Sequence, residues 1–104
     1  MGTRGEDWEE AEMLRVLAFY ASLNGGPYSE EDVQELADRM PNRGPATIKL
    51  RIANYVARDP RMKEAGRKGF SGGGNKATAF VQKYLLDDGS FDLAKLLNDC
   101  AKHL

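Results

Sequence analysis

The chain has 104 residues, 41% of them hydrophobic and 30% charged, and a formal net charge of −1. This length and composition predict one small domain over residues 1–104. No apolar run approaches the roughly 20 residues that a membrane-spanning helix needs, and the acidic first residues lack a hydrophobic signal stretch. The single Cys100 cannot form an internal disulfide, which agrees with a reducing compartment. We therefore expect a cytoplasmic protein without a membrane partner.

Charge is distributed unevenly along the chain. Residues 41–84 contain ten Lys or Arg and two acidic residues, for a net charge of +8. Residues 1–40 contain three basic and ten acidic residues, for −7, and residues 85–104 contain two basic and four acidic residues, for −2. A basic block of this kind can neutralise phosphates. The near-neutral total therefore conceals a candidate polyanion-binding stretch.

The spacing of apolar residues predicts an all-α fold, a compact bundle of about five helices. In chain order they cover about 7–23, 30–40, 45–58, 76–86 and 91–103. Ser29 and Asp32 resemble a capping box at the start of the second helix, and Pro45 suits the first turn of the third. Asn75 and Ser90 are expected to cap the fourth and fifth helices. A short helical turn is also feasible at about 61–65.

The second and third helices, with the short turn between them, are typical of a helix-turn-helix core. Besides its apolar face, the third helix carries a second stripe formed by Thr47, Arg51, Asn54 and Arg58. If this stripe faces solvent, Arg51 suits a bidentate contact with guanine and Asn54 one with adenine. The alternative is an ordinary helical corner with a solvated face, in which Asn54 braces the core.

A loop that is basic and then glycine-rich follows, at about 61–74. Glycines allow a backbone to approach a phosphate closely. Phe70 is the best candidate for stacking on a base, although it could equally fix the loop to the core. A solvated loop whose charge aids solubility is the alternative. The candidate nucleic-acid-binding residues of the turn, the third helix and the loop are Arg43, Thr47, Lys49, Arg51, Asn54, Arg58, Arg61, Lys63, Arg67, Lys68 and Lys76.

The residues do not favour an enzyme. The only histidine, His103, lies next to the C-terminus, and no Ser/His/Asp or Cys/His set can be assembled without it. Cys100 and His103 do not suffice for a zinc finger within one chain. The glycine loop lacks the spacing of a nucleotide-binding P-loop and follows no predicted strand. We therefore expect no catalytic residue, no metal site and no cofactor.

Residues 29–84 contain a series of short motifs. These are Leu36-Ala37-Asp38-Arg39-Met40, Ala46 through Tyr55, Arg58-Asp59-Pro60, Gly66 through Gly72, and a helix with Phe80, Val81 and Tyr84. Together they resemble the helical N-terminal module that precedes HNH-type nuclease domains in restriction-like bacterial proteins. The resemblance implies a DNA-handling module. It does not imply cleavage, because no nuclease motif is present in this chain.

Two classes of function remain open at this point. The first is a small helical protein that binds DNA, with RNA as the less favoured nucleic acid. The second is a protein-interaction module or an inhibitor of the phage or mobile-element type. Such a module would dock through the acidic N-terminal third or the basic middle, on a protein partner or on a second copy in a homodimer.

Overall fold

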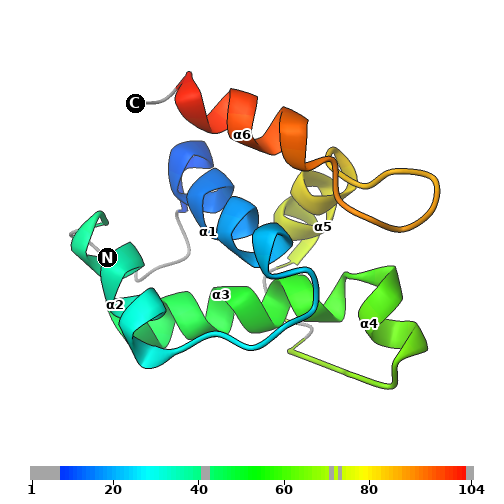
Figure 1. Ribbon diagram of the computed structural model, residues 1–104, viewed down its shortest axis with the longest axis horizontal. Helices are drawn as coiled ribbons and strands as arrows, with labels where there is room; N and C mark the ends of the chain where they lie inside the picture. The colour runs from blue at the N-terminus through cyan, green and yellow to red at the C-terminus, as the bar shows by residue number, and fades with distance from the viewer. Residues whose placement is uncertain (1–7, 41–42, 71, 73, 103–104) are drawn as a thin grey trace.

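The computed structural model describes residues 8–40, 43–70, 72 and 74–102, and within these ranges the chain forms six helices and no sheet (Figure 1). The helices are α1 (Glu10–Leu23), α2 (Glu30–Asp38), α3 (Pro45–Ala57), α4 (Pro60–Glu64), α5 (Gly74–Gln82) and α6 (Leu93–Ala101). The predicted all-α class is confirmed. The additional helix is α4, which lies where the sequence allowed a short helical turn.

The starts of α2 and α3 follow from local sequence chemistry. The Asp32 backbone N–H donates to Ser29 Oγ, and Asp32 Oδ2 accepts from the Ser29 backbone N–H, both at 3.1 Å. This is the reciprocal capping box that the sequence predicted. Pro45 is the first residue of α3, where its missing N–H costs no helical hydrogen bond.

The predicted caps of the last two helices are wrong. Asn75 lies inside α5, one residue after its start. Ser90 lies in a turn that is closed by an isolated antiparallel bridge between Leu85 and Phe91. Asp92 caps α6 instead, because its carboxylate accepts a backbone hydrogen bond of 3.1 Å from the first turn of that helix.

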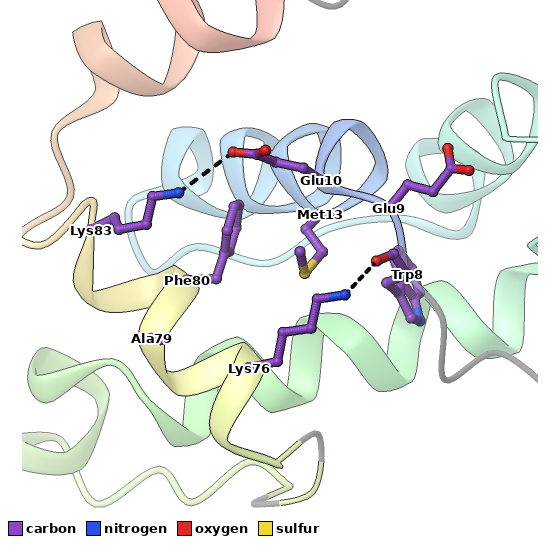
Figure 2. A pocket seen from close by; sticks show the side chains of 8 residues that line it. All are labelled: Trp8, Glu9, Glu10, Met13, Lys76, Ala79, Phe80 and Lys83. Atoms are coloured by element: carbon purple, nitrogen blue, oxygen red, sulfur yellow. Dashed lines mark hydrogen bonds and ion pairs between the residues drawn. The ribbon is translucent and has the colours of Figure 1, made fainter.

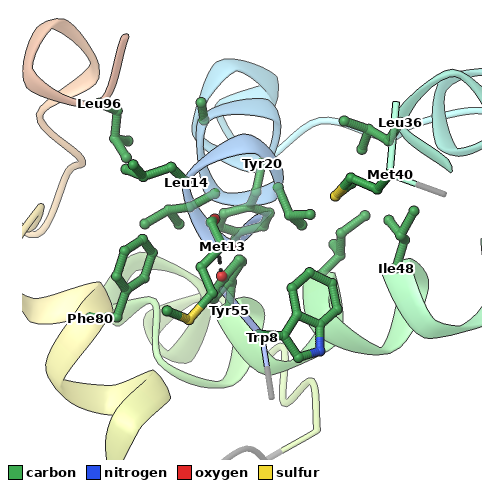
Figure 3. Close-up of a cluster of buried hydrophobic side chains, with 14 of the residues drawn as sticks. Trp8, Met13, Leu14, Tyr20, Leu36, Met40, Ile48, Tyr55, Phe80 and Leu96 are labelled. Carbon is green, nitrogen blue, oxygen red and sulfur yellow. Dashed lines mark hydrogen bonds between the residues drawn. The ribbon is translucent and has the colours of Figure 1, made fainter. Parts of the chain in front are cut away.

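Helix α3 is the central element of the fold. It packs against α1, α2, α4 and α5, while α1 also packs against α6 (Figure 1). The core between these helices contains the fully buried Tyr55, whose hydroxyl donates to the Met13 carbonyl at 3.2 Å, and Ile48 (Figure 3). A helix with neighbours on several sides must bury more than its apolar stripe.

The size of the molecule agrees with this close packing. The Cα radius of gyration is 13.0 Å, as is typical of about 100 compact residues. Among the described residues, no helix combines the length and the apolar character needed to cross a membrane.

Candidate nucleic-acid interface

The polar stripe of α3 points into the molecule. Arg51 is 9% exposed and Asn54 is 4% exposed. The guanidinium carbon of Arg51 lies 4.6 Å from the centre of the Trp8 ring and 6.0 Å from that of Tyr55. The prediction that Arg51 and Asn54 face a DNA groove is therefore wrong. Because α3 is central, a second of its faces is covered, here by the residues that lead into α1.

Asn54 holds the loop that follows α4 against α3. Its Nδ2 donates to the Leu50 carbonyl at 3.0 Å and to the Phe70 carbonyl at 3.3 Å. A buried amide must find such partners, and backbone carbonyls of the helix and the loop supply them. The alternative role, in which Asn54 braces the structure, is the one that the structure shows.

Arg58 joins the end of α3 to the start of α5. Its Nε donates to Thr78 Oγ1 at 3.0 Å, and its terminal nitrogens donate to the carbonyls of Asn54 and Gly74 at 3.0 and 3.2 Å. Thr47, the remaining member of the stripe, is half-buried. The Arg58 guanidinium thus donates its hydrogen bonds to groups within the protein, although its predicted role was a contact with nucleic acid.

Arg43 forms a part-buried ion pair with Glu12. Its Nε and one terminal nitrogen donate to the two carboxylate oxygens of Glu12, at 3.1 and 2.8 Å, while its guanidinium lies 4.4 Å from the centre of the Trp8 ring. Burial acts to raise the pKa of Glu12, but the hydrogen bonds from Arg43 and from the Glu9 backbone N–H, together with the positive charge of Arg43, outweigh it and hold that pKa below its ordinary value. The Arg43 side chain is only 9% exposed, so the nucleic-acid contact that the sequence predicted for Arg43 is not available to it.

Lys76 and Lys83 lie along a groove between the start of α1 and α5 (Figure 2). Lys76 Nζ donates to the Trp8 carbonyl at 3.2 Å, and Lys83 Nζ pairs with the Glu10 carboxylate at 3.5 Å. The groove has a volume of about 740 Å³ and is lined by Trp8, Glu9, Glu10, Met13, Lys76, Ala79, Phe80 and Lys83. The ammonium of Lys76 therefore helps to hold the start of α1, although the predicted role was a contact with nucleic acid.

The outward face of α3 offers little to a polyanion. Ala46 and Leu50 are exposed there. Lys49 is the cation on this face among the described residues of α3, and its Nζ pairs with the Glu30 carboxylate at 2.6 Å. The helix pair α2–α3 thus presents no row of free hydrogen-bonding tips of the kind that a recognition helix carries.

Four of the predicted nucleic-acid-binding residues face solvent without a side-chain hydrogen bond or ion pair among the described residues, and they lie together in the chain. We call residues 61–68 the basic segment; its basic members are Arg61, Lys63, Arg67 and Lys68. All four are exposed, and none makes a side-chain hydrogen bond or ion pair within the described ranges. One acidic residue, Glu64, leaves the basic segment with a net charge of +3.

The start of the basic segment is anchored to α1 by a buried carboxylate. Asp59, 5% exposed, accepts from the Arg61 backbone N–H at 3.0 Å and from the Tyr20 hydroxyl at 2.7 Å. The first bond caps α4. Burial raises the pKa of Tyr20, and the hydrogen bond to Asp59 acts in the same direction. Helix α4 is therefore held in place while its charged side chains remain in water.

The end of the basic segment is anchored to α3. The Phe70 backbone N–H donates to the Ala53 carbonyl at 3.0 Å. With Asp59 at the other end, this bond makes the segment a supported surface rather than a free loop.

No candidate metal site is present among the described residues, because they hold no group of three or more metal-ligating side chains. His103 lies outside the described residues.

Comparison with known proteins identified no relative of this chain. No family model, curated protein sequence or solved structure matches the chain. The function is therefore inferred from the chain's own geometry and charge.

Proposed function

We propose that the protein binds nucleic acid, with double-stranded DNA as its first target, by placing the basic segment on the phosphate backbone. The observation that carries this proposal is the set of four exposed cations, Arg61, Lys63, Arg67 and Lys68, that make no side-chain hydrogen bond or ion pair within the described part of the chain. Guanidinium and ammonium groups held on an anchored surface gain affinity from each phosphate that they neutralise.

The proposed contact positions the protein and does not read a sequence. Base recognition in the major groove needs exposed hydrogen-bonding tips, and the two best candidates, Arg51 and Asn54, are buried. The resemblance of residues 29–84 to a DNA-handling module agrees with this class of ligand. Binding is expected to depend strongly on salt and weakly on sequence.

Exposed acidic groups include Asp88, which is close enough to Arg61 to interact with it electrostatically, and a second group that lies on α2, away from α4. Glu31, Glu35 and Asp38 are exposed on α2, which lies at the left of Figure 1, whereas α4 lies at the lower right. A polyanion repels the α2 end and attracts the α4 end. This polarity would orient the protein as it approaches DNA.

A titration of labelled duplex DNA with the protein over a series of salt concentrations tests the proposal. The logarithm of the affinity should fall linearly with the logarithm of the salt concentration, with a slope of about −3 if three to four phosphates are neutralised. Parallel titrations with RNA of the same length rank the two nucleic acids. Absence of binding to either one at low salt would rule the proposal out.

A second candidate, docking on a basic protein partner, is favoured by the exposed acidic face of α2. Glu31 and Glu35 make no side-chain hydrogen bond or ion pair among the described residues. Reversing the charges of Glu31 and Glu35 should abolish capture of a basic protein partner. Treatment with nuclease should leave that capture intact. Glu12 is unsuitable for this test, because its reversal would break the ion pair with Arg43.

A further inference from the structure

Phe70 directs an exposed aromatic ring into solvent at the end of the basic segment. The residue is 49% exposed, compared with 37% for Tyr28, the other exposed large aromatic side chain among the described residues. Arg67 and Lys68, both exposed, precede it in the chain. The structure thus combines an accessible ring with adjacent cations.

The backbone beneath this ring is fixed by three independent contacts. The Phe70 N–H donates to the Ala53 carbonyl at 3.0 Å, and its carbonyl accepts from Asn54 Nδ2 at 3.3 Å. Gly69, at φ +63°, packs so closely on α3 that a Cβ there would lie 2.6 Å from the Ala57 nitrogen. The same contacts that remove Asn54 from base reading therefore hold Phe70 in position.

The ring itself has a neighbour that restricts it. A Cβ added at Gly72 would collide with the Phe70 ring, so the ring rests against the backbone of Gly72. A ring that is already ordered loses little conformational entropy when a ligand packs on its free surface. Loop anchoring and ring placement together make a preorganised aromatic platform.

We propose that Phe70 stacks on an unpaired nucleobase, so that the preferred ligand is DNA with a locally unpaired base next to duplex. This inference rests on the proposed function, because the basic segment must hold the flanking phosphates. An aromatic face accepts any base, since every base has a π-surface. In the proposed complex, the exposed cations of Arg67 and Lys68, three and two positions before Phe70, would contact the sugar-phosphate chain beside that base.

Two DNA ligands of equal length test the inference, one a perfect duplex and the other a duplex with a single unpaired 2-aminopurine. The wild-type protein should bind the second about tenfold more tightly and quench its fluorescence. Phe70→Leu, which keeps an apolar side chain but loses the π-face, should remove both effects and leave affinity for the perfect duplex unchanged. Phe70→Trp, which keeps an aromatic ring at this position, should retain both the tighter binding and the quenching.

The matched control is Leu97→Ala, which removes a similarly exposed apolar side chain on α6. It should retain the preference for the unpaired base. Equal binding of both ligands by the wild-type protein, together with a perfect duplex that is still bound, would overturn the inference and leave the proposed function standing. Persistence of the preference in Phe70→Leu, with helicity unchanged, would overturn it as well. Failure to bind either ligand would overturn the proposed function itself.

Discussion

The guanidinium of Arg51 lies 4.6 Å from the centre of the Trp8 ring, and this contact fixes the direction in which the polar stripe of α3 points. The guanidinium of Arg43 lies 4.4 Å from the centre of the same ring, so the single tryptophan makes cation–π contacts with two arginines. The ring is 4% exposed. Cation–π contacts gain strength in such desolvated surroundings, so Arg51 contributes to the fold and not to a reading surface.

Arg51→Ala should lower the free energy of unfolding by about 2 kcal/mol, because it removes a desolvated cation–π contact and the packing of the side-chain stem. Urea denaturation measures the change. Lys49→Ala, on the exposed face of the same helix, is the control and should cost less than about 0.5 kcal/mol. An unchanged stability of Arg51→Ala would contradict the structural role.

The same relationship shows what could be predicted from the sequence and what could not. The apolar periodicity and the Ser29–Asp32 capping box depend on residues close in the chain, and both were predicted correctly. Which polar face meets solvent depends on contacts between distant residues, such as Trp8 with Arg51, which lie 43 positions apart. The basic composition of residues 41–84 indicated a charged surface, but only the fold separates its exposed members from those used internally.

Gly69→Ala should destabilise the protein more than Gly66→Ala does. Both glycines have positive φ, +63° and +80°, so alanine is strained at either position by about 1 kcal/mol. Only at position 69 would the new Cβ also meet the backbone of α3, whereas at position 66 it would have no neighbour within 4 Å. Chemical denaturation of both variants measures the difference, and equal losses would show that the loop does not dock on α3.

Hydrogen exchange gives a local measurement of the same docking. The Phe70 amide, which donates to Ala53, should exchange faster in Gly69→Ala and stay close to the wild-type rate in Gly66→Ala. A uniform acceleration over the whole chain in Gly69→Ala would instead indicate global destabilisation.

Stability should fall at alkaline pH because of buried tyrosines. Burial raises the pKa of Tyr20 and of Tyr55 above the ordinary value of 10.0. The folded state therefore keeps these protons while the unfolded state releases them. The contribution of the two protonated tyrosines to the free energy of unfolding is complete below about pH 10. It is lost as the pH rises from there towards their higher pKa values in the folded state, by up to about 1.4 kcal/mol per pH unit for each tyrosine.

Tyr20→Phe isolates one of these contributions. The variant should be less stable at neutral pH by about 1–2 kcal/mol, because buried Asp59 loses the donor at 2.7 Å. Above pH 10 its stability should decline less steeply than that of the wild type. Urea midpoints over a pH series measure both effects, and parallel alkaline slopes for the two proteins would contradict the assignment.

The most direct measurement compares two variants that each remove two positive charges. Lys63→Gln with Lys68→Gln changes the basic segment, whereas Lys95→Gln with Lys102→Gln changes two exposed lysines, one in α6 and one just after its last residue. Helix α6 lies at the top of Figure 1, away from α4. Affinity for duplex DNA is measured for both over a salt series. The first variant should bind more weakly, and its slope of log affinity against log salt concentration should be smaller in magnitude by about two. The second variant should match the wild type in both respects. Equal losses in the two variants, or none in the first, would contradict the account.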